Sequence, residues 1–310
     1  MAASISKGFA LCYFFIAVSQ GVLLRSKSNS ERDGTPTPIV MWHGMGDSCC
    51  ARGIGRLQQI LQSNIAGVYV HSIEIGANEQ EDFANSYFMS VNKQVEQVCR
   101  NISSNPLLQN GYHAIGFSQG GQFLRAVAQR CPMGMRNLVT LGGQHQGVFG
   151  LPRCPPGSAV ICTYIRQLLD KGAMTDFVQE RLVQAQYWHD SLKEEEYRSK
   201  SLFLADINNE VTKNATYKEN LQKLENFVMV KFLKDSMVYP DESEWFGYYC
   251  PGQATEICSL RNSTLYQEDW LGLKAMDQAG KLKFIPAAGD HLQFTTEWFL
   301  KTIVGPYLSS

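Results

Sequence analysis

The chain has 310 residues, of which 44% are hydrophobic and only 18% are charged, against about 25% charged residues in an average globular protein. This composition excludes an intrinsically disordered chain, a collagen and a coiled coil, which need low hydrophobicity, a strict glycine period or abundant charge. The 28 basic and 29 acidic residues leave a net charge of −1. Because the sequence has no basic run, we expect no nucleic-acid partner.

The first 26 residues have the pattern of a secretory signal peptide. Lys7 precedes the apolar run Phe9–Val18, and the small residues Ser19 and Gly21 follow it. This run is too short for a membrane span, which needs about 20 residues, but it suits the core of a signal peptide. We expect residues 1–26 to be removed, and the alternative is an uncleaved anchor. No other run approaches the length of a transmembrane segment, and 27–310 is predicted to be a single domain.

Strand and helix patterns alternate along the first half of this domain. Runs of β-branched and aromatic residues predict strands, and apolar residues that recur every three or four positions predict helices between them. The predicted strands are 39–42, 68–70, 112–117 and 137–141. Such alternation is typical of a parallel sheet with helices on both faces. We therefore predict an α/β fold with a mostly parallel central sheet flanked by helices.

A glycine-rich turn, His43-Gly44-Met45-Gly46, follows the first predicted strand. In hydrolases that carry a serine on a sharp strand-to-helix turn, a loop after an early strand supplies the second donor to the oxyanion. We predict that the backbone N–H groups of Met45 and Gln119 form this oxyanion hole. The alternative is a structural turn with a packed histidine.

The sharp turn itself is predicted at Gly116-Phe117-Ser118-Gln119-Gly120, which matches G-x-S-x-G. An apolar strand leads into it and an amphipathic helix leads out, as in a nucleophile elbow. Small flanking residues let the strand and the helix pass closely, and the first amides of the helix face a developing oxyanion. We predict that Ser118 is a nucleophile. The alternative is a glycine-rich turn with a capping serine.

The alternation breaks at residue 142, and helical segments follow to about residue 225. We interpret 143–226 as an inserted helical subdomain that covers the carboxyl ends of the strands. The sheet pattern resumes at 227–233 and at 282–285. The apolar residues of the insertion are expected either to wall a groove beside Ser118 or to form the insertion's own core: Val148, Phe149, Leu151, Ile161, Ile165, Leu168, Phe177, Val178, Leu182 and Trp188.

A serine nucleophile needs a histidine base and an acid that orients the histidine, in the chain order serine, acid, histidine. His291 lies just beyond the last predicted strand and is predicted to be the base. Asp235 follows the most strand-like run and is predicted to be the acid. Asp206 is its competitor, and Asp290 is too close in sequence to His291 to aim at its ring.

The cysteines and the Asn-x-Ser/Thr sequons suit an exported protein. Without the signal peptide the chain keeps eight cysteines, an even number that suits disulfides, although eight thiols allow 105 pairings. Proximity suggests Cys154–Cys162 and Cys250–Cys258, and Cys99 and Cys131 end two consecutive predicted helices and could meet at one edge. Cys49 and Cys50 are then left for each other. Alternatively several remain buried thiols, and a zinc site is disfavoured because no C-x-x-C pair occurs. Candidate glycan sites are Asn101, Asn214 and Asn262.

Longer motifs resemble the palmitoyl-protein thioesterase family, and the likeness covers essentially the whole mature chain. They are Met41–Cys50, Gly116–Gln122, Leu141–Val148, Glu180–Asp190 and Gly289–Gln293. The resemblance implies an α/β-hydrolase fold and a lysosomal enzyme that removes long-chain fatty acyl groups from cysteine thioesters of proteins. It also implies sorting by a mannose 6-phosphate receptor. The residues that it implies are the triad Ser118, Asp235 and His291 and the disulfides Cys49–Cys50, Cys99–Cys131 and Cys154–Cys162.

The sequence departs from the family pattern in three respects. Cys250 and Cys258 are extra, which favours a fourth bridge between them. Lys234 replaces the asparagine of a family sequon, and the sequons at Asn101 and Asn262 are not typical of the family.

The sequence therefore predicts a serine thioesterase that needs no metal or cofactor and acts on S-acylated proteins and peptides or on long-chain acyl thioesters. We expect it in the lysosome, reached through the secretory pathway, and also outside the cell. Two other hypotheses stay open. One is a secreted lipase or carboxylesterase that uses the same triad on oxyesters, and the other is a non-catalytic binding module that keeps the hydrolase fold.

Overall fold

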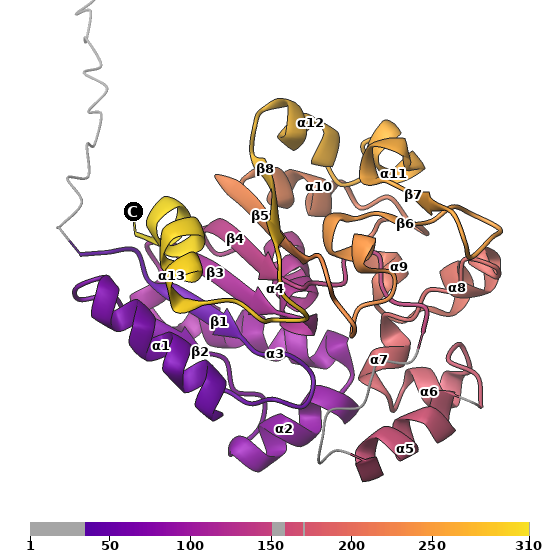
Figure 1. The fold of residues 1–310 in the computed structure, drawn as a ribbon, viewed down its shortest axis with the longest axis horizontal. Coiled ribbons are helices and arrows are strands. Elements are labelled where there is room, and N and C mark those ends of the chain that lie inside the picture. The colour runs from indigo at the N-terminus through magenta and orange to yellow at the C-terminus, as the bar shows by residue number, and fades with distance from the viewer. Residues whose placement is uncertain (1–34, 151–158, 170, 310) are drawn as a thin grey trace, which may run out of the picture. The chain divides into compact units, whose positions relative to one another are not determined.

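Six strands form one sheet in the computed structural model, which describes residues 35–150, 159–169 and 171–309. The strands are β1 (Ile39–Trp42), β2 (Val70–Ser72), β3 (Tyr112–Phe117), β4 (Met135–Leu141), β5 (Asn226–Phe232) and β8 (Leu282–Ala287). Their spatial order is β2-β1-β3-β4-β5-β8, and every neighbouring pair is parallel (Figure 1). The predicted α/β fold with a mostly parallel sheet is confirmed.

Helices cover both faces of the sheet, because its strands carry apolar side chains on both sides. Ile39 and Met41 of β1 share a core with α1 (Arg52–Asn64) and with the C-terminal segments α13 (Thr296–Phe299) and η4 (Leu300–Leu308). Alternate residues of a strand point to opposite faces. Accordingly Val40 and Trp42 pack into a second core, with α3 (Val91–Ser104) and α4 (Gln119–Arg130).

The segment between β4 and β5 is helical in the part that the structure describes. Its helices are α5 (Ala159–Leu169), α6 (Asp176–Gln179), α7 (Val183–Gln186), α8 (Glu194–Lys200), α9 (Leu204–Ile207) and α10 (Ala215–Gln222). The first three share a small core with Tyr87. In contrast, α10 packs on α4 beside the sheet, where a crossover helix belongs. We therefore propose that the insertion ends before α10 rather than at residue 226.

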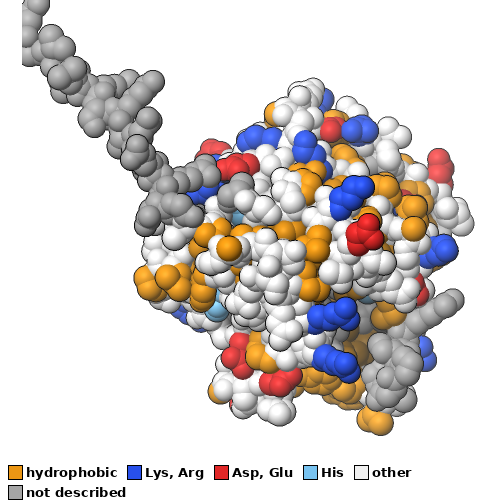
Figure 2. All heavy atoms as spheres, turned by 60° about the vertical axis from the view of Figure 1, so that its left-hand side comes forward, with side chains coloured by type: hydrophobic (Ala, Val, Ile, Leu, Met, Phe, Trp, Pro, Cys, Tyr) orange, Lys and Arg blue, Asp and Glu red, His pale blue; other side chains and the backbone are white. Residues whose placement is uncertain are grey.

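Smaller elements complete the described chain. Before β3 lie α2 (Glu79–Phe88) and η1 (Pro106–Leu108). Between β5 and β8 lie an antiparallel pair, β6 (Tyr248–Tyr249) and β7 (Ile257–Cys258), and four short helices. These helices are η2 (Asp241–Trp245), η3 (Leu260–Asn262), α11 (Thr264–Gln267) and α12 (Leu273–Gln278). None of the helices in the described ranges combines the length and the apolar character needed to cross a membrane. Basic, acidic and apolar side chains are interspersed over the face shown in Figure 2.

Three disulfides join described cysteines. Cys99 of α3 is bonded to Cys131 at the end of α4, and Cys250 is bonded to Cys258 across the β6–β7 pair. The neighbours Cys49 and Cys50 form the third bridge. The remaining predicted pair includes Cys154, which lies outside the described residues, as does the predicted signal peptide.

Candidate active site

Ser118 lies at a tight turn between β3 and α4. Its φ is +53°, a conformation that non-glycine residues rarely adopt and that costs about 1–3 kcal/mol. The Ser118 N–H donates to the Leu141 carbonyl of β4 at 2.8 Å, and the Ser118 carbonyl accepts from the Gly121 N–H at 2.9 Å. The turn thus places the serine at the amino end of α4, where the first N–H groups have no helical acceptor.

Glycines let α4 approach the strands on either side of this turn. A Cβ at Gly120 would collide with the backbone oxygens of Trp42 and His43. A Cβ at Gly116 would collide with the backbone of Gly120 and Gly121. Both glycines of the G-x-S-x-G pattern are therefore needed for the close packing of strand and helix.

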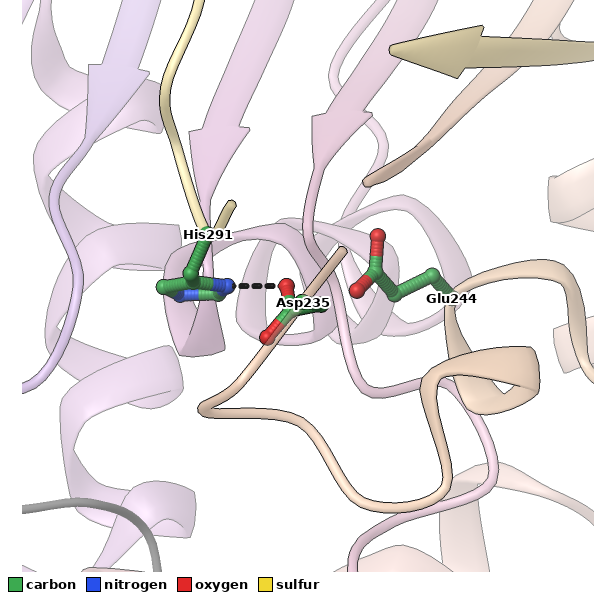
Figure 3. Close-up of side chains that lie close together, drawn as sticks. All are labelled: Asp235, Glu244 and His291. Atoms are coloured by element: carbon green, nitrogen blue, oxygen red, sulfur yellow. Dashed lines mark hydrogen bonds and ion pairs between the residues drawn. The ribbon is translucent and has the colours of Figure 1, made fainter. Parts of the chain in front are cut away.

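His291 and Asp235 come from the loops that follow the neighbouring strands β8 and β5. His291 Nδ1 lies 2.5 Å from Asp235 Oδ2 (Figure 3), and the Asp235 side chain is fully buried. Asp235 Oδ1 accepts the amide hydrogens of Met237 at 2.7 Å and Val238 at 2.8 Å. Burial acts to raise the pKa of Asp235, but the hydrogen bonds from His291 and from the Val238 amide lower it overall. A carboxylate in this position can orient the imidazole through Nδ1, an arrangement in which Nε2 would be available to exchange a proton.

Asp206, the competing acid, lies on α9 in a different setting. Its Oδ2 accepts hydrogen bonds from Arg130 at 2.7 Å and from the Tyr217 hydroxyl at 3.0 Å. Its side chain is 47% exposed. The structure therefore brings Asp235, and not Asp206, to His291.

Asp290 links the two loops that carry the acid and the histidine. Its Oδ1 accepts the N–H of Ser236 at 2.8 Å and the N–H of His291 at 2.7 Å. Its Oδ2 accepts the Ser236 hydroxyl at 3.0 Å. Asp290 thus holds the backbone of both loops, and its described hydrogen bonds go to Ser236 and to the His291 N–H rather than to the imidazole ring.

The Ser118 hydroxyl is hydrogen-bonded to a side chain to which no role was assigned from the sequence. Gln144 Nε2 donates to Ser118 Oγ at 3.0 Å, and Gln144 Oε1 accepts from Gln122 Nε2 at 3.2 Å. Among the described residues no hydrogen bond joins Ser118 Oγ to His291, although both line one cavity. Gln144 stands in the family motif Leu141–Val148, which was the only signal for it, because its reach to the serine depends on the path of the loop.

The two residues predicted to supply the oxyanion hole lie in segments that adjoin Ser118. A Cβ at Gly44 would lie 3.1 Å from the Ser118 Cβ, so the loop after β1 touches the elbow. Met45 of this loop lines the same cavity as Ser118. Gln119 is the first residue of α4, a position whose N–H has no acceptor within the helix.

His43 connects the loop after β1 to a buried aspartate of α2. His43 Nε2 lies 3.0 Å from Asp82 Oδ1, and both side chains are buried. Asp82 also accepts the N–H groups of Ile75 at 2.8 Å and Cys49 at 2.7 Å. Burial acts to lower the pKa of His43 and to raise that of Asp82, but their mutual attraction reverses both shifts, so the pKa of His43 is raised and that of Asp82 is lowered. A buried ion pair therefore ties the loop to α2.

A cavity of about 330 Å³ opens beside Ser118 and His291, a volume within the range of small-molecule sites. Apolar and aromatic side chains form much of its wall: Met45, Tyr87, Val148, Ile161, Ile165, Tyr187, Met237 and Leu292. Polar groups that line it include Gln144, Asp290 and Arg166. Ser118 and His291 therefore lie beside a largely apolar cavity.

The helical insertion contributes to this wall only in part. Of the apolar residues predicted there, those that line the cavity are Val148, Ile161 and Ile165. Leu168, Val178 and Leu182 belong to the small core of the insertion, and Phe177 is 48% exposed. Phe149 and Trp188 pack against each other, and Leu151 lies outside the described residues. Helical spacing marks a residue as apolar, but it does not distinguish a helical core from a cavity wall.

Asp235, Glu244 and His291 are the described residues whose spacing would suit a metal ion. One nitrogen or oxygen atom of each lies within 4.8 Å of the other two (Figure 3). However, His291 Nδ1 and Asp235 Oδ2 are hydrogen-bonded to each other, and Glu244 Oε2 accepts the Phe232 N–H at 2.9 Å. One candidate ligand atom of each residue is therefore already engaged in a hydrogen bond.

The comparisons with known proteins agree with this geometry. A family model described as palmitoyl protein thioesterase matches residues 38–291. The chain belongs to this family. Palmitoyl-protein thioesterase 1 of Caenorhabditis elegans is 49% identical over 272 residues, which cover 87% of this chain and 91% of the relative. The resemblance predicted from the motifs is confirmed, and the chain is a thioester hydrolase with an α/β-hydrolase fold.

More distant relatives carry related names. Palmitoyl-protein thioesterase 3 of Dictyostelium discoideum is 33% identical over 276 residues, which cover 88% of this chain and 90% of the relative. Lysosomal thioesterase PPT2-B of Xenopus laevis is 23% identical over 262 residues, which cover 81% of this chain and 85% of the relative. The similarity to these thioesterases thus extends over most of both chains.

Proposed function

We propose that the protein is a serine thioesterase that releases long-chain acyl groups, above all palmitoyl, from cysteines of S-acylated proteins or peptides. One observation carries the proposal: the 2.5 Å hydrogen bond between His291 and the buried Asp235, beside a cavity that also contains Ser118. The names of the C. elegans and D. discoideum relatives support palmitoyl as the acyl group.

Acylation begins when His291 Nε2 takes the hydroxyl proton of Ser118 and Oγ attacks the carbonyl carbon of the thioester. Gln144 Nε2 donates to Oγ and therefore leaves the hydroxyl hydrogen of Ser118 available for transfer to His291. The charge that develops on the carbonyl oxygen is bound by the N–H groups of Met45 and Gln119. The C–S bond then breaks, and the sulfur leaves as a thiol with the proton from His291.

Deacylation repeats the sequence with water as the nucleophile. His291 takes a proton from water, which attacks the acyl-Ser118 ester, and the fatty acid leaves as Ser118 Oγ recovers the proton. Asp235 stays ionised and stabilises the imidazolium in both halves. Its lowered pKa keeps it charged in mildly acidic solution.

The apolar cavity wall supports a long acyl chain. A palmitoyl tail buries about fourteen methylenes at about 0.8 kcal/mol each, a gross stabilisation of about 11 kcal/mol. A polar cleft would supply little of this. The methionine, leucine, isoleucine and aromatic side chains beside Ser118 provide the surface that the tail needs.

We also propose that the enzyme works during lysosomal degradation, is sorted by a mannose 6-phosphate receptor, and is in part secreted. The signal peptide predicted at 1–26 and the disulfides fit this route. Asn101 and Asn262 are exposed, and Asn214 is the N-cap of α10. The name of the X. laevis relative supports the lysosome. N-terminal sequencing and a shift in mass on glycosidase treatment test processing and glycosylation.

The test of the function compares kcat/KM for matched acyl thioesters and oxyesters, together with labelling by a fluorophosphonate probe. We expect a preference for the thioester and a label on Ser118 that the Ser118→Ala variant lacks. A preference for the oxyester would instead indicate a lipase or carboxylesterase. Absence of both turnover and label would indicate a non-catalytic module.

A further inference from the structure

Glu244 is a fully buried carboxyl group that the mechanism above does not use. It lies on η2 and is 0% exposed. Its Oε2 accepts the N–H of Phe232, the last residue of β5, at 2.9 Å. Its Oε1 is buried and has no hydrogen-bond partner among the described residues. A buried polar atom left without a partner costs about 1–3 kcal/mol, so the position of Oε1 needs an explanation.

The Glu244 carboxyl group faces Asp235 on the side away from His291 (Figure 3). An oxygen of Glu244, an oxygen of Asp235 and a ring nitrogen of His291 all lie within 4.8 Å of one another. Two ionised carboxylates this close inside a protein repel strongly, so one of them holds a proton. Which one depends on the donors that surround each group.

Asp235 is the carboxylate that keeps the charge. It accepts hydrogen bonds from His291 and from the amides of Met237 and Val238, whereas Glu244 accepts one amide hydrogen. Burial and the adjacent charge of Asp235 raise the pKa of Glu244 well above its ordinary range, and Asp241 on the same element adds to the shift. Glu244 is therefore the group that stays neutral.

A neutral Glu244 has an O–H group that can donate a hydrogen bond to the remaining acceptor site of Asp235. An ionised carboxylate has about four acceptor sites, and three hydrogen bonds to Asp235 are already described. A carboxylic acid carries one O–H donor, so the same contact satisfies both Glu244 and the remaining site of Asp235. The nearest basic side chain on β5, Lys231, pairs with Asp241 and Glu242 instead.

We propose that Glu244 is a positioning residue that donates its carboxyl O–H to Asp235 and so fixes the carboxylate that orients His291. The proposal rests on the proposed function, because Asp235 matters to the reaction only if His291 is the base. Neutral Glu244 adds a hydrogen bond to the pair without adding a second negative charge beside the imidazole. An ionised Glu244 could not donate this hydrogen bond and would place a second negative charge beside the imidazole.

The test compares the variants Glu244→Gln and Glu244→Leu of the full-length enzyme in thioester hydrolysis. Glutamine can accept the Phe232 N–H through its oxygen and donate to Asp235 through its amide, whereas leucine, of similar size, can do neither. We expect kcat/KM of Glu244→Gln within about threefold of wild type and that of Glu244→Leu at least about tenfold lower, as for loss of a hydrogen bond to a charged group.

The pH profile separates a neutral from an ionised Glu244. The acidic limb of kcat/KM reports an essential ionisation in the free enzyme. Glu244→Gln should leave the midpoint of this limb unchanged, because it removes no charge. A shift of the midpoint to lower pH would show that a negative charge beside the imidazolium had been lost, and would overturn the proposal.

Two further measurements keep the proposal falsifiable if Glu244→Leu does not fold. Infrared spectroscopy should show the C=O band of a protonated carboxyl group in the wild type that Glu244→Gln lacks, and its absence from the wild type would overturn the proposal. Thermal unfolding detects a purely structural role, in which the variants lose stability while kcat/KM of the folded fraction stays at the wild-type level. A wild type without Ser118-dependent thioester turnover would instead refute the proposed function.

Discussion

At the scale of single residues, the donors around each carboxylate decide its role. Asp235 is buried and faces His291, Asp206 faces Arg130 at the surface, and Asp290 accepts backbone N–H groups. The three aspartates carry the same functional group and differ in which groups their carboxylates contact. This difference predicts that substitutions to asparagine at these positions have very different effects.

Asp235→Asn is expected to lower kcat/KM by about 10³–10⁴. The asparagine amide would donate to His291 Nδ1 and hold the imidazole in the tautomer that cannot take a proton at Nε2. Asp206→Asn is the matched control and should stay within about threefold of wild type, because it weakens only a partly exposed ion pair. Steady-state kinetics with an acyl thioester check both, and a damaging effect confined to Asp206→Asn would contradict the assignment of the acid.

The sequence predicted Ser118, Asp235 and His291 because each follows a predicted strand, and the carboxyl ends of parallel strands meet at one edge of the sheet. The same reasoning does not identify Gln144 or Glu244. Gln144 reaches Ser118 through the course of a loop, and Glu244 is one of several acidic residues in Asp241–Trp245. Only the folded chain shows that Glu244 is buried while Asp241 and Glu242 contact Lys231.

At the scale of elements, the site depends on how closely α4 and the loop after β1 approach each other. The absence of a side chain at Gly120 lets the helix rest against the carboxyl end of β1. The ion pair of His43 with Asp82 then holds the adjoining loop to α2. Each of these contacts gives a separate prediction.

Gly120→Ala should lower the free energy of unfolding by about 3 kcal/mol or more, because the new methyl group overlaps backbone atoms that cannot rotate away. Gly55→Ala in α1 is the matched control. A Cβ there meets no atom within 4 Å, so alanine should stabilise the helix by about 0.5–1 kcal/mol. Chemical denaturation measures both, and equal stability of the two variants would contradict the close approach.

Asp82→Asn should destabilise the fold by about 3 kcal/mol in mildly acidic buffer, because it leaves a buried charge on His43 unpaired. The raised pKa of His43 means that the stabilisation is full below its ordinary value of 6.5 and is lost as the pH rises through the folded value. The lowered pKa of Asp82 means that the stabilisation is present above its ordinary value of 3.8 and is lost as the pH falls through the folded value. The effect of the substitution should therefore be largest between these pH values and smaller in alkaline buffer.

The control for this pH dependence is Glu96→Gln, which removes an exposed ion pair with Arg100 on α3. We expect it to change the unfolding free energy by less than about 0.5 kcal/mol at any pH. Denaturation curves recorded across the pH range check both variants. An effect of Asp82→Asn that does not change with pH would contradict an ionised pair.

At the scale of the whole molecule, the predicted alternation of strands and helices is borne out by the six-stranded parallel sheet. The insertion was harder to delimit from the sequence. α10 carries the same helical spacing as the helices before it, yet it packs on α4 beside the sheet. Periodicity in the sequence identifies a helix. Whether that helix covers the sheet or belongs to the insertion depends on contacts with residues far away in the chain.

The cavity that the insertion helps to form predicts the dependence on acyl chain length. In a series of acyl thioesters kept below their micelle concentrations, kcat/KM should rise steeply with chain length, since each buried methylene contributes about 0.8 kcal/mol. The rise should reach a plateau when the tail fills the apolar space beside Ser118. Equal kcat/KM for short and long chains would show that the tail is not bound.

The central claim is that Ser118 carries the acyl group between the two halves of the reaction. The most direct measurement mixes the enzyme with a palmitoyl thioester, quenches it with acid before the steady state, and maps the acylated peptide by mass spectrometry. We predict one palmitoyl group on the peptide that contains Ser118, lost as free fatty acid appears, and no adduct or turnover in Ser118→Ala. Turnover without an acylated serine, or wild-type turnover by Ser118→Ala, would contradict the account.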